Sequence, residues 1–494
     1  MKNKRMTYDV DECPPVSKWI ILALQHVFAM FGATILVPIL VNSAAGEEVL
    51  TIPVALVTSG IGTLIYILCT KGKSPVYLGS SFAFIAPIAA AFLKGGISGA
   101  MTGIMAVGLI YIIVALIIKF AGKAWLDKLL PPVVIGPMIM IIGLGLAPSA
   151  ISQIGIASGA EFEWKVVLVA VVSFLVTAIV MTRAKGFFKI IPFLIGIISG
   201  YILAVILGMI DFTPVLEAKF FSLPKFVLPF VHYKISFGAL LTIAPIALVT
   251  LCEHIGDHKS LSNIIGKDLI NDPGLDRTIM GDGIATFVAG MLGGPANTTY
   301  GENTSVVGMT KVASVKVIGL AAIIAIIIGF LGKFTALVST IPSSVLGGVS
   351  LLLYGFIAVN GLKVLIKNQV NFENSKNVIV ASSMLVLGLG GAAISIVSGD
   401  LSVTISGMSL ASVVGIILNL ALKDDEDALD VDPDIVEVKE EKKSSKKEIN
   451  DLKKAIKDEL TVELKSELLD EIKKELVKDT KKVTKPVKKE VKKK

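Results

Sequence analysis

Long apolar runs, separated by short polar loops, fill the sequence from Val16 to Leu422. A helix needs about 20 apolar residues to cross the hydrocarbon core of a bilayer. A soluble domain of this length would carry charge throughout, so the pattern predicts an all-α polytopic membrane protein with about fourteen spans. We expect the spans near 16–42, 50–70, 81–94, 98–119, 131–149, 164–183, 188–210, 236–258, 275–292, 301–312, 314–335, 342–364, 375–394 and 401–422.

Charge is confined to the loops and to the end of the chain. Of the 47 Lys and Arg and the 40 Asp and Glu, 21 of each kind follow Leu422, so the apolar part carries the whole net charge of +7. Within that part, Lys and Arg gather in alternate loops, as the positive-inside rule expects of cytoplasmic loops. We therefore expect an even number of spans, both termini in the cytoplasm, contact with the lipid bilayer and no nucleic-acid partner.

Three parts of the chain follow from this pattern: a cytoplasmic N-terminus (1–15), a transmembrane region (16–422) and a charged cytoplasmic tail (423–494). Apolar residues recur at every fourth position of the tail, so their row spirals around a helix and forms no heptad seam. We expect a solvated, partly helical tail, with an assembly helix as the alternative.

Enzymatic sites and cofactors are not indicated. The three cysteines are far apart and show no C-x-x-C spacing, so we expect neither a disulfide framework nor a zinc site. There is no phosphate-binding loop and no nucleophile elbow. We therefore expect no ATP-driven transport, no cofactor and no enzymatic activity.

Two of the expected spans, 81–94 and 301–312, are too short to cross a bilayer. They are the third and the tenth, and interrupted segments at corresponding positions of two halves are typical of an inverted repeat with a binding site near the midplane. Polar segments precede both, at 77–84 and 293–303. Their backbone N–H groups could face a polar ligand at the start of a half-helix; the alternative is two re-entrant loops that only pack.

Ionisable side chains within membrane spans are costly and are functional candidates by default. Glu253 and Asp257 share one face of the eighth span, and Glu302 begins the tenth. We expect Glu253 to be the deeper acid of the eighth span, and we expect Asp257 and Asp282 near the cytoplasmic side, where water reaches Asp282. The structural alternatives are a hydrogen-bonded acid for Glu253 and a helix cap for Glu302.

Histidines provide a second set of candidates. His26 lies in the first span, where it either serves the site or joins helices by hydrogen bonding. His254 and His258 have the spacing of a zinc-binding pair, but no glutamate lies between them and no third ligand is evident. An intramembrane metalloenzyme is therefore the weakest interpretation. Tyr354 in the twelfth span either faces the site or only packs.

Four segments, taken in this order, resemble the nucleobase/ascorbate transporter (nucleobase:cation symporter-2) family, and within it most of all the bacterial uracil permeases. They are Gln25-His26, Tyr77 to Phe84, Glu253 to Gly256 and Asn297 to Asn303. The resemblance covers about residues 10–422. It implies a 7+7 inverted repeat of fourteen spans with short antiparallel strands before half-helices 3 and 10. It also implies a core domain (spans 1–4 and 8–11), a gate domain (spans 5–7 and 12–14), a homodimer and a bacterial inner membrane.

The function that the resemblance implies is proton-coupled symport of uracil into the cell by alternating access. The substrate-binding positions that it implies are Glu253, Glu302, Phe82, Gly301, Tyr354, Ser81 and Tyr300. The positions that it implies for proton coupling are Glu253, Asp257 and His26. Two positions depart from the family: Asp257 stands where uracil permeases can carry a histidine, and Ser305 replaces a usual glycine, which could narrow the room for the base.

Uracil presents two N–H donors and two carbonyl acceptors, and a buried site must satisfy all four. Carboxylates can accept from the ring N–H groups, and backbone N–H groups can donate to the carbonyls. Two charged acids beside a neutral base would repel each other in a low dielectric. We therefore hypothesise that Glu253 binds the base in its protonated form, while Glu302 stays charged at its helix start.

Two other kinds of transporter fit the same pattern. A purine permease of the same family, for xanthine or urate, would use the same architecture. An anion exchanger of related fold would exploit the paired half-helix N-termini, but buried carboxylates oppose an anionic ligand.

Overall fold

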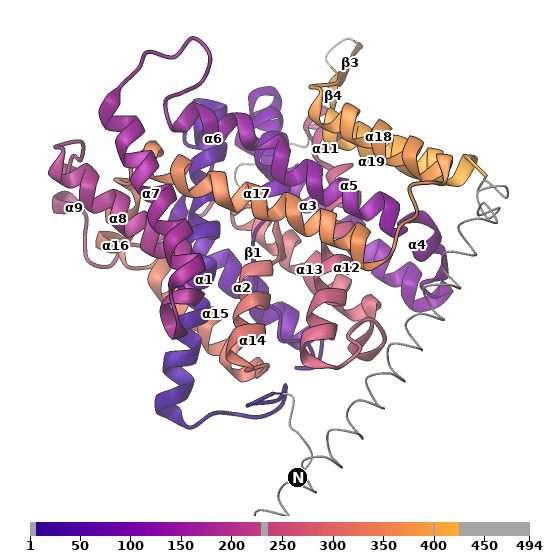
Figure 1. Ribbon diagram of the computed structural model, residues 1–494, viewed down its shortest axis with the longest axis horizontal. Coiled ribbons are helices and arrows are strands. Elements are labelled where there is room, and N and C mark those ends of the chain that lie inside the picture. Colours follow the sequence, from indigo (N-terminus) through magenta and orange to yellow (C-terminus); the bar gives the residue numbers. More distant parts are fainter. Residues whose placement is uncertain (1–5, 229–235, 399–400, 424–494) are drawn as a thin grey trace, which may run out of the picture. The chain divides into compact units, whose positions relative to one another are not determined.

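The computed structural model describes residues 6–228, 236–398 and 401–423, which lie within one compact unit, Met1–Asp424. Helices dominate this unit, and two short antiparallel sheets complete it (Figure 1). The expected helical tail at 424–494 lies outside the described residues.

The first half of the unit runs from the N-terminus to residue 217. Its elements are α1 (Val16–Ala45), α2 (Ile52–Cys69), β1 (Leu78–Ser80), the 3-10 helix η1 (Phe82–Phe84), α3 (Ile85–Ala121), α4 (Ala124–Leu129), α5 (Pro132–Gly145), α6 (Ala147–Gln153), α7 (Trp164–Arg183), η2 (Gly186–Ile190), α8 (Pro192–Ile206) and α9 (Thr213–Glu217).

The second half begins at residue 237 and contains the second short strand of the buried sheet. Its elements are α11 (Phe237–Ile243), α12 (Ile246–Ile265), the π-helix η3 (Ile270–Gly274), α13 (Leu275–Met291), β2 (Asn297–Thr299), α14 (Gly301–Thr310), α15 (Val315–Gly329), α16 (Gly332–Ser339), α17 (Ser343–Lys367), α18 (Ser375–Leu389), β3 (Ala393–Ser398), β4 (Leu401–Ser406) and α19 (Gly407–Ala421).

Seven helices of the described chain are long and apolar enough to cross a membrane, and four more apolar helices are shorter. The span Trp164–Arg183 shows why lipid is needed, since only 22% of its most apolar window is buried inside the protein. Water would leave that apolar surface uncovered, whereas a bilayer covers it. The chain is therefore a multi-pass membrane protein.

The helix after β1 is broken inside its apolar stretch. Gly96 has a left-handed φ of 60°, which interrupts α3 between the expected spans 81–94 and 98–119. The corresponding helix of the second half, α14, has only 10 residues. Each short helix is preceded by a strand, so both halves place extended backbone directly before a half-helix.

Strands β1 and β2 pair antiparallel inside the protein, with Gly79 opposite Thr298. Backbone bonds extend the pairing at both ends, from Ser81 N to Ala296 O (2.9 Å) and from Tyr300 N to Tyr77 O (3.1 Å). Extended backbone is tolerated at membrane depth only where protein satisfies its polar groups.

Helix α2 provides hydrogen-bond partners for the backbone of β1 on the edge that does not pair with β2. The hydroxyl of Ser59 donates to the carbonyl of Leu78 at 2.7 Å, and the N–H of Leu78 donates to Oγ1 of Thr63 at 2.9 Å. These hydroxyls replace the water that an exposed strand edge would bind. The strand is therefore fixed by side chains of its own half of the chain.

Glycine residues permit close packing around the paired strands β1 and β2. A Cβ on Gly79 would overlap the ring of Tyr300, and one on Gly294 would overlap the side chain of Thr58. Helix and strand backbones can approach this closely only where no side chain intervenes. Each of the two glycines therefore marks a position where a methyl group would displace a neighbour.

Helix contacts fall into two groups. In the first, α13 packs against α2 and α3, and α15 packs against α2 and α1. In the second, α17 packs against α5, α6 and α7, and α18 packs against α19 and α5 (Figure 1). Helix α12 contacts both groups. It packs against β2 and α14, which adjoin α13 and α1 of the first group, and against α5 and α19 of the second group.

Two expected span boundaries are wrong. The last span does not begin at 401, because 401–406 form β4, which pairs antiparallel with β3. The alternation of apolar and polar residues in this segment has the period of a strand, which an average of hydropathy does not register. The eighth span does not end at 258: α12 continues to Ile265, since its polar residues find partners within the protein.

Residues 6–12, which we call the N-terminal strap, lie along the segment after α14. Tyr8 forms a parallel bridge with Val312, and the carbonyl of Val10 accepts from the N–H of Val315 at 3.0 Å. Met6 and Val10 are buried. An ion pair of 2.8 Å joins Asp9 to Lys267, just beyond α12. The strap thus joins the end of α14 to the end of α12.

Candidate functional site

Four acidic side chains from three helices form a cluster around α12, and two of them bond to the strand β2. Glu253 and Asp257 project from α12, Glu302 from the first turn of α14, and Asp282 from α13. The charges of Asp257, Glu302 and Asp282 each act on Glu253. Within the described residues, none of these acids forms an ion pair with Lys or Arg. The structure therefore brings the two acids expected to bind substrate, Glu253 and Glu302, into electrostatic reach of each other.

Two threonines of β2 tie that strand to α12. Thr299 Oγ1 donates to Asp257 Oδ2 at 2.5 Å, and Thr298 Oγ1 donates to Glu253 Oε2 at 3.4 Å. Both threonines are buried, whereas the two acids are half-buried. Each carboxylate has a second oxygen for which the described residues supply no hydrogen-bond donor, so both acids can accept further bonds.

Tyr300 lies where β1, β2 and α1 meet. Its hydroxyl donates to the carbonyl of Ser80 at 3.0 Å and accepts from Thr34 Oγ1 at 3.1 Å. The ring lies directly against Gly79. Tyr300 therefore joins β1, β2 and α1 and sets the position at which α14 begins.

The start of α14 borders open space. A Cβ added to Gly301 would meet no atom within 4 Å, although the neighbouring strand is tightly packed. Glu302 follows in the first helical turn, where the N–H groups have no intrahelical partner. Ser305 is exposed, and its hydroxyl donates back to the carbonyl of Gly301 at 2.9 Å. Because of that bond, the hydroxyl of Ser305 is directed toward the backbone of its own helix.

The first half contributes a matching helix start at η1. Phe82 is buried and meets Tyr354 of α17 edge to face, with ring centroids 5.9 Å apart. Ser81 is fully buried, and its Oγ has no hydrogen-bond partner among the described residues. Tyr354 therefore brings the second helix group to the expected site, and Ser81 retains a hydroxyl that can bind a ligand.

His26 supports the site from α1. The side-chain amide of Asn303 lies 3.1 Å from His26 Nδ1 and donates to the carbonyl of His26 at 3.1 Å. An amide N–H₂ group can only donate, so Nδ1 of His26 is the acceptor and its proton is on Nε2. Because Asn303 follows Glu302 directly, this contact fixes the first turn of α14 against α1.

The two histidines of α12 lie about 100° around the helix from Glu253 and Asp257. His254 Nδ1 is 2.8 Å from Asp282 Oδ2, and both side chains are completely buried. His258 Nε2 is 2.6 Å from the hydroxyl of Tyr66. The expectation that water reaches Asp282 is wrong, because its partner on α12 draws it into the protein. The two histidines therefore bind protein groups of two neighbouring helices.

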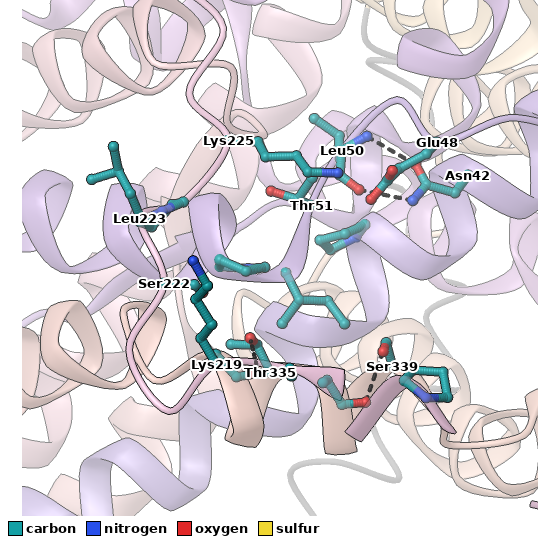
Figure 2. A pocket seen from close by; sticks show the side chains of 18 of the residues that line it. Asn42, Glu48, Leu50, Thr51, Lys219, Ser222, Leu223, Lys225, Thr335 and Ser339 are labelled. Carbon is teal, nitrogen blue, oxygen red and sulfur yellow. Dashed lines mark hydrogen bonds between the residues drawn. The ribbon is translucent and has the colours of Figure 1, made fainter. Parts of the chain in front are cut away.

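A cavity of about 710 Å³ lies apart from this site, between the second half of α1, the start of α2, the segment 214–225 and α16 (Figure 2). Asn42 lines it and holds the entry to α2, since its side-chain oxygen accepts from the N–H groups of Val49 and Leu50, both at 2.9 Å. The acids and tyrosines of the expected site do not line this cavity.

The sequence did not single out Thr34, Thr298, Thr299 or Tyr66 as functional. The two strand threonines stand directly before the half-helix that carries Glu302, which was the available signal. Thr34 and Tyr66 carried no signal, because hydroxyl residues are common in membrane helices. Only the packing of α1 and α2 brings them to Tyr300 and His258.

Comparisons of the sequence identify related proteins. The model of the family described as "Permease family" matches residues 17–397. The uracil permease of Bacillus subtilis (strain 168) is 48% identical over 428 residues, covering 85% of this chain and 96% of that protein. The uracil permease of Escherichia coli (strain K12) is 42% identical, covering 85% and 94%. The putative pyrimidine permease RutG of the same strain is 36% identical, covering 82% and 88%.

Solved structures show a similar fold at low sequence identity. The transmembrane domain of the cyanobacterial bicarbonate transporter BicA matches with a TM-score of 0.54 at 16% identity, covering 80% of this chain and 97% of that domain. The murine anion transporter Slc26a9 in its inward-facing state matches with a TM-score of 0.60 at 11% identity, covering 83% and 69%. These similarities establish a shared transporter fold and no shared substrate.

Proposed function

This chain belongs to the nucleobase/ascorbate family of permeases, and from that premise we propose that it carries uracil into the cell together with protons. It is a transporter and not an enzyme, because its relatives are permeases. The substrate is proposed from two observations: relatives named uracil permeases match over almost their whole length, and the site offers the hydrogen-bonding groups that uracil requires.

One observation carries the proposal: the charge of Glu302, in the first turn of α14, acts on Glu253, which bonds to the strand directly before that half-helix. Their carboxylates would accept the ring N–H groups of uracil. The backbone N–H groups of Phe82 and Gly301 would donate to its carbonyl oxygens. The open space beside Gly301 supports this placement, because a flat ring needs room next to the backbone. Buried donors and acceptors left unpaired would cost affinity, so this pattern would favour uracil.

Aromatic residues would hold the faces of the ring. Tyr354 and Phe82 already pack against each other at the site and come from different helix groups. Tyr300 would border the base from the strand crossing, and the free hydroxyl of Ser81 would supply one more hydrogen bond. Because Tyr354 belongs to the α17 group, a bound base would contact both groups at once.

Proton coupling would arise from the repulsion between the acids. With no Lys or Arg paired to them, charging all four carboxylates in a low dielectric would be costly. A proton on Glu253 removes one charge and leaves the acid able to bind the neutral base. Glu302 would remain charged because the unpaired N–H groups of its helix start stabilise an anion. Asp257 and His26 would support the coupling through Thr299 and Asn303.

Transport would follow from movement between the two helix groups. We propose that the first group, with β1, β2, α12 and α14, is the core domain of spans 1–4 and 8–11, and that the α17 group is the gate domain of spans 5–7 and 12–14. The helix broken at Gly96 would count as two spans, α5 with α6 and α11 with α12 would count as one span each, and the short α4, α9 and α16 would not count. The resulting fourteen spans support the proposed 7+7 inverted repeat. Alternating access would move one domain against the other around the base.

The proposed setting is a bacterial inner membrane, with both termini in the cytoplasm and two copies of the chain per transporter. The lysine-rich alternate loops support this orientation. The strap supports it as well, since it places the N-terminus beside the loops that carry Lys267 and Lys311.

Uptake of labelled uracil into proteoliposomes, with and without an inward proton gradient, tests the function. We expect accumulation above equilibrium only with the gradient, and its loss when a protonophore dissipates the gradient. Excess xanthine or urate should leave uptake unchanged. Competition by these purines would reassign the substrate within the family, and uptake that ignores the gradient would refute proton coupling.

A further inference from the structure

A buried acid–base pair joins α12 to α13, separate from the groups that are proposed to bind uracil. Asp282 of α13 and His254 of α12 meet at 2.8 Å, and neither side chain has any exposed surface. The other oxygen of the acid, Oδ1, and the other ring nitrogen, Nε2 of His254, are buried without a hydrogen-bond partner among the described residues. The proposed binding of uracil uses neither residue.

The number of protons that the pair of Asp282 and His254 can hold follows from its net charge. A neutral histidine and a neutral carboxylic acid together have no net charge, and the same is true of a histidinium beside a carboxylate. If that one proton leaves, the pair keeps a net charge of −1 in a place that water does not reach. An uncompensated buried charge is costly. The pair therefore binds one exchangeable proton, and both free atoms are positions that can receive it.

His258 keeps its own proton, so the exchangeable proton belongs to the pair of Asp282 and His254. Its Nδ1 is 2.7 Å from the carbonyl oxygen of His254, which can only accept, so Nδ1 carries a proton. Its Nε2 lies 2.6 Å from the oxygen of Tyr66, whose hydroxyl donates to Ser74 Oγ at 2.9 Å. The rings of His254 and His258 stack with centroids 4.1 Å apart. Two stacked cations would repel each other, so only one of the two rings can carry a positive charge, and the carboxylate of Asp282 favours that charge on His254.

The surrounding titratable groups link this pair to the uracil site. Glu253 and Asp257 lie on the same helix, and the charge of Asp282 acts on both. The other groups that face the cluster are Glu302 from α14, Tyr66 and Cys69 from α2, and Tyr111 from α3, whose hydroxyl bonds to Thr250. Because the nearby charges are negative, a proton on the pair makes it easier for Glu253 to be charged.

We propose that Asp282 and His254 form a second proton-binding site, which keeps a proton inside the core domain when Glu253 gains or loses its own. The proposal rests on the proposed proton-coupled function. It places two exchangeable protons on two faces of α12 about 100° apart, one at the substrate and one at the pair. An empty transporter with a charged Glu253 could then change its orientation without carrying two uncompensated buried charges.

An Asp282→Asn variant tests this site, because asparagine resembles the acid in its protonated form and cannot release the proton. In proteoliposomes we expect uracil binding, and uracil exchange without a gradient, within about threefold of the unaltered protein. Accumulation driven by an inward proton gradient should fall at least tenfold. Asp272→Asn is the matched control: it is the same substitution at an acid that is 70% exposed and paired with Lys73, and it should leave all three measurements unchanged.

Two results would overturn the second proton site. One is gradient-driven accumulation by Asp282→Asn within twofold of the unaltered protein. The other is a parallel loss of binding, exchange and accumulation, which would give Asp282 a purely structural role. Absence of gradient-driven accumulation in the unaltered protein would instead refute the proposed function, so the two failures are distinguishable.

Histidine NMR supplies a readout that a structural role would not move. The chain has four histidines, so ring-nitrogen labelling of the full protein in lipid gives few signals, and a His254→Gln variant assigns one of them. We expect the His254 signal to change with pH, and this change to disappear in Asp282→Asn. The His258 signal should keep its proton on Nδ1 throughout. A His254 signal that is independent of pH in the unaltered protein would contradict the proposal.

Discussion

Thr299 donates a hydrogen bond of 2.5 Å to Asp257, which joins the strand before one half-helix to the helix that also carries Glu253. Asp257 is one of the two positions, with Ser305, at which we expect the sequence to depart from the uracil permeases it resembles. The departure has a local partner, since the aspartate accepts from a buried threonine hydroxyl. The bond ties β2 to α12, so the orientation of Glu253, one turn away, depends on it.

The first prediction concerns this bond. Thr299→Val keeps the shape of the side chain and removes the donor, so Asp257 loses a charge-assisted hydrogen bond worth about 1.5–3 kcal/mol. We expect a lower midpoint of thermal unfolding in detergent and weaker uracil binding. Thr298→Val is the comparison, because its bond to Glu253 is long, at 3.4 Å, and it should cost less. A larger loss for Thr298→Val would contradict this ranking.

The second prediction concerns Gly79 in β1 and Gly301 at the start of α14. Gly79→Ala would push against the ring of Tyr300, and such overpacking costs about 1–3 kcal/mol. Gly301→Ala meets no neighbour, so the unfolding midpoint should stay unchanged. Its methyl group would instead fill the space proposed for uracil, and uptake should fall at least tenfold. The proposed place of the base would be wrong if Gly301→Ala bound uracil normally.

The third prediction separates the two substrate acids by pH. If uracil binds to protonated Glu253, binding by the unaltered protein weakens as pH rises, because that proton is lost. Glu253→Gln keeps a neutral group, so its uracil binding should no longer vary with pH and its gradient-driven accumulation should fall at least tenfold. Glu302→Gln removes the charged acceptor and should weaken binding at every pH. Accumulation by Glu253→Gln that still followed the proton gradient would reject the assignment.

The fourth prediction concerns the N-terminal strap. Val10→Asp places an unpaired charge in a position with 5% exposure, so we expect a marked fall in the unfolding midpoint, equivalent to about 2 kcal/mol or more. Asp9→Asn removes only a partly exposed ion pair with Lys267, whose loss should cost less than about 1 kcal/mol. Equal midpoints for the two variants would show that the strap does not stabilise the core.

Much of the site was predictable because ionisable side chains are costly inside a membrane and are rare there unless they have a function. Glu253, Glu302 and His26 stood out as polar groups in apolar runs, and the two short spans marked where the helices begin anew. Asp282 was misjudged because its position along the helix places it near the cytoplasmic side. The partner that removes it from water, His254, is 28 residues away in the sequence.

The apolar runs alone show that this chain crosses a membrane many times, since no water-soluble packing can cover so many of them, and the order of the motifs along the chain identifies its family. Which polar groups meet depends on how the helices and strands pack. The pairs Thr299–Asp257, Tyr300–Ser80 and His254–Asp282 join elements from distant parts of the chain. Hydrogen bonds of this kind depend on distances of a few ångströms between helices, and periodicity along one helix does not encode them.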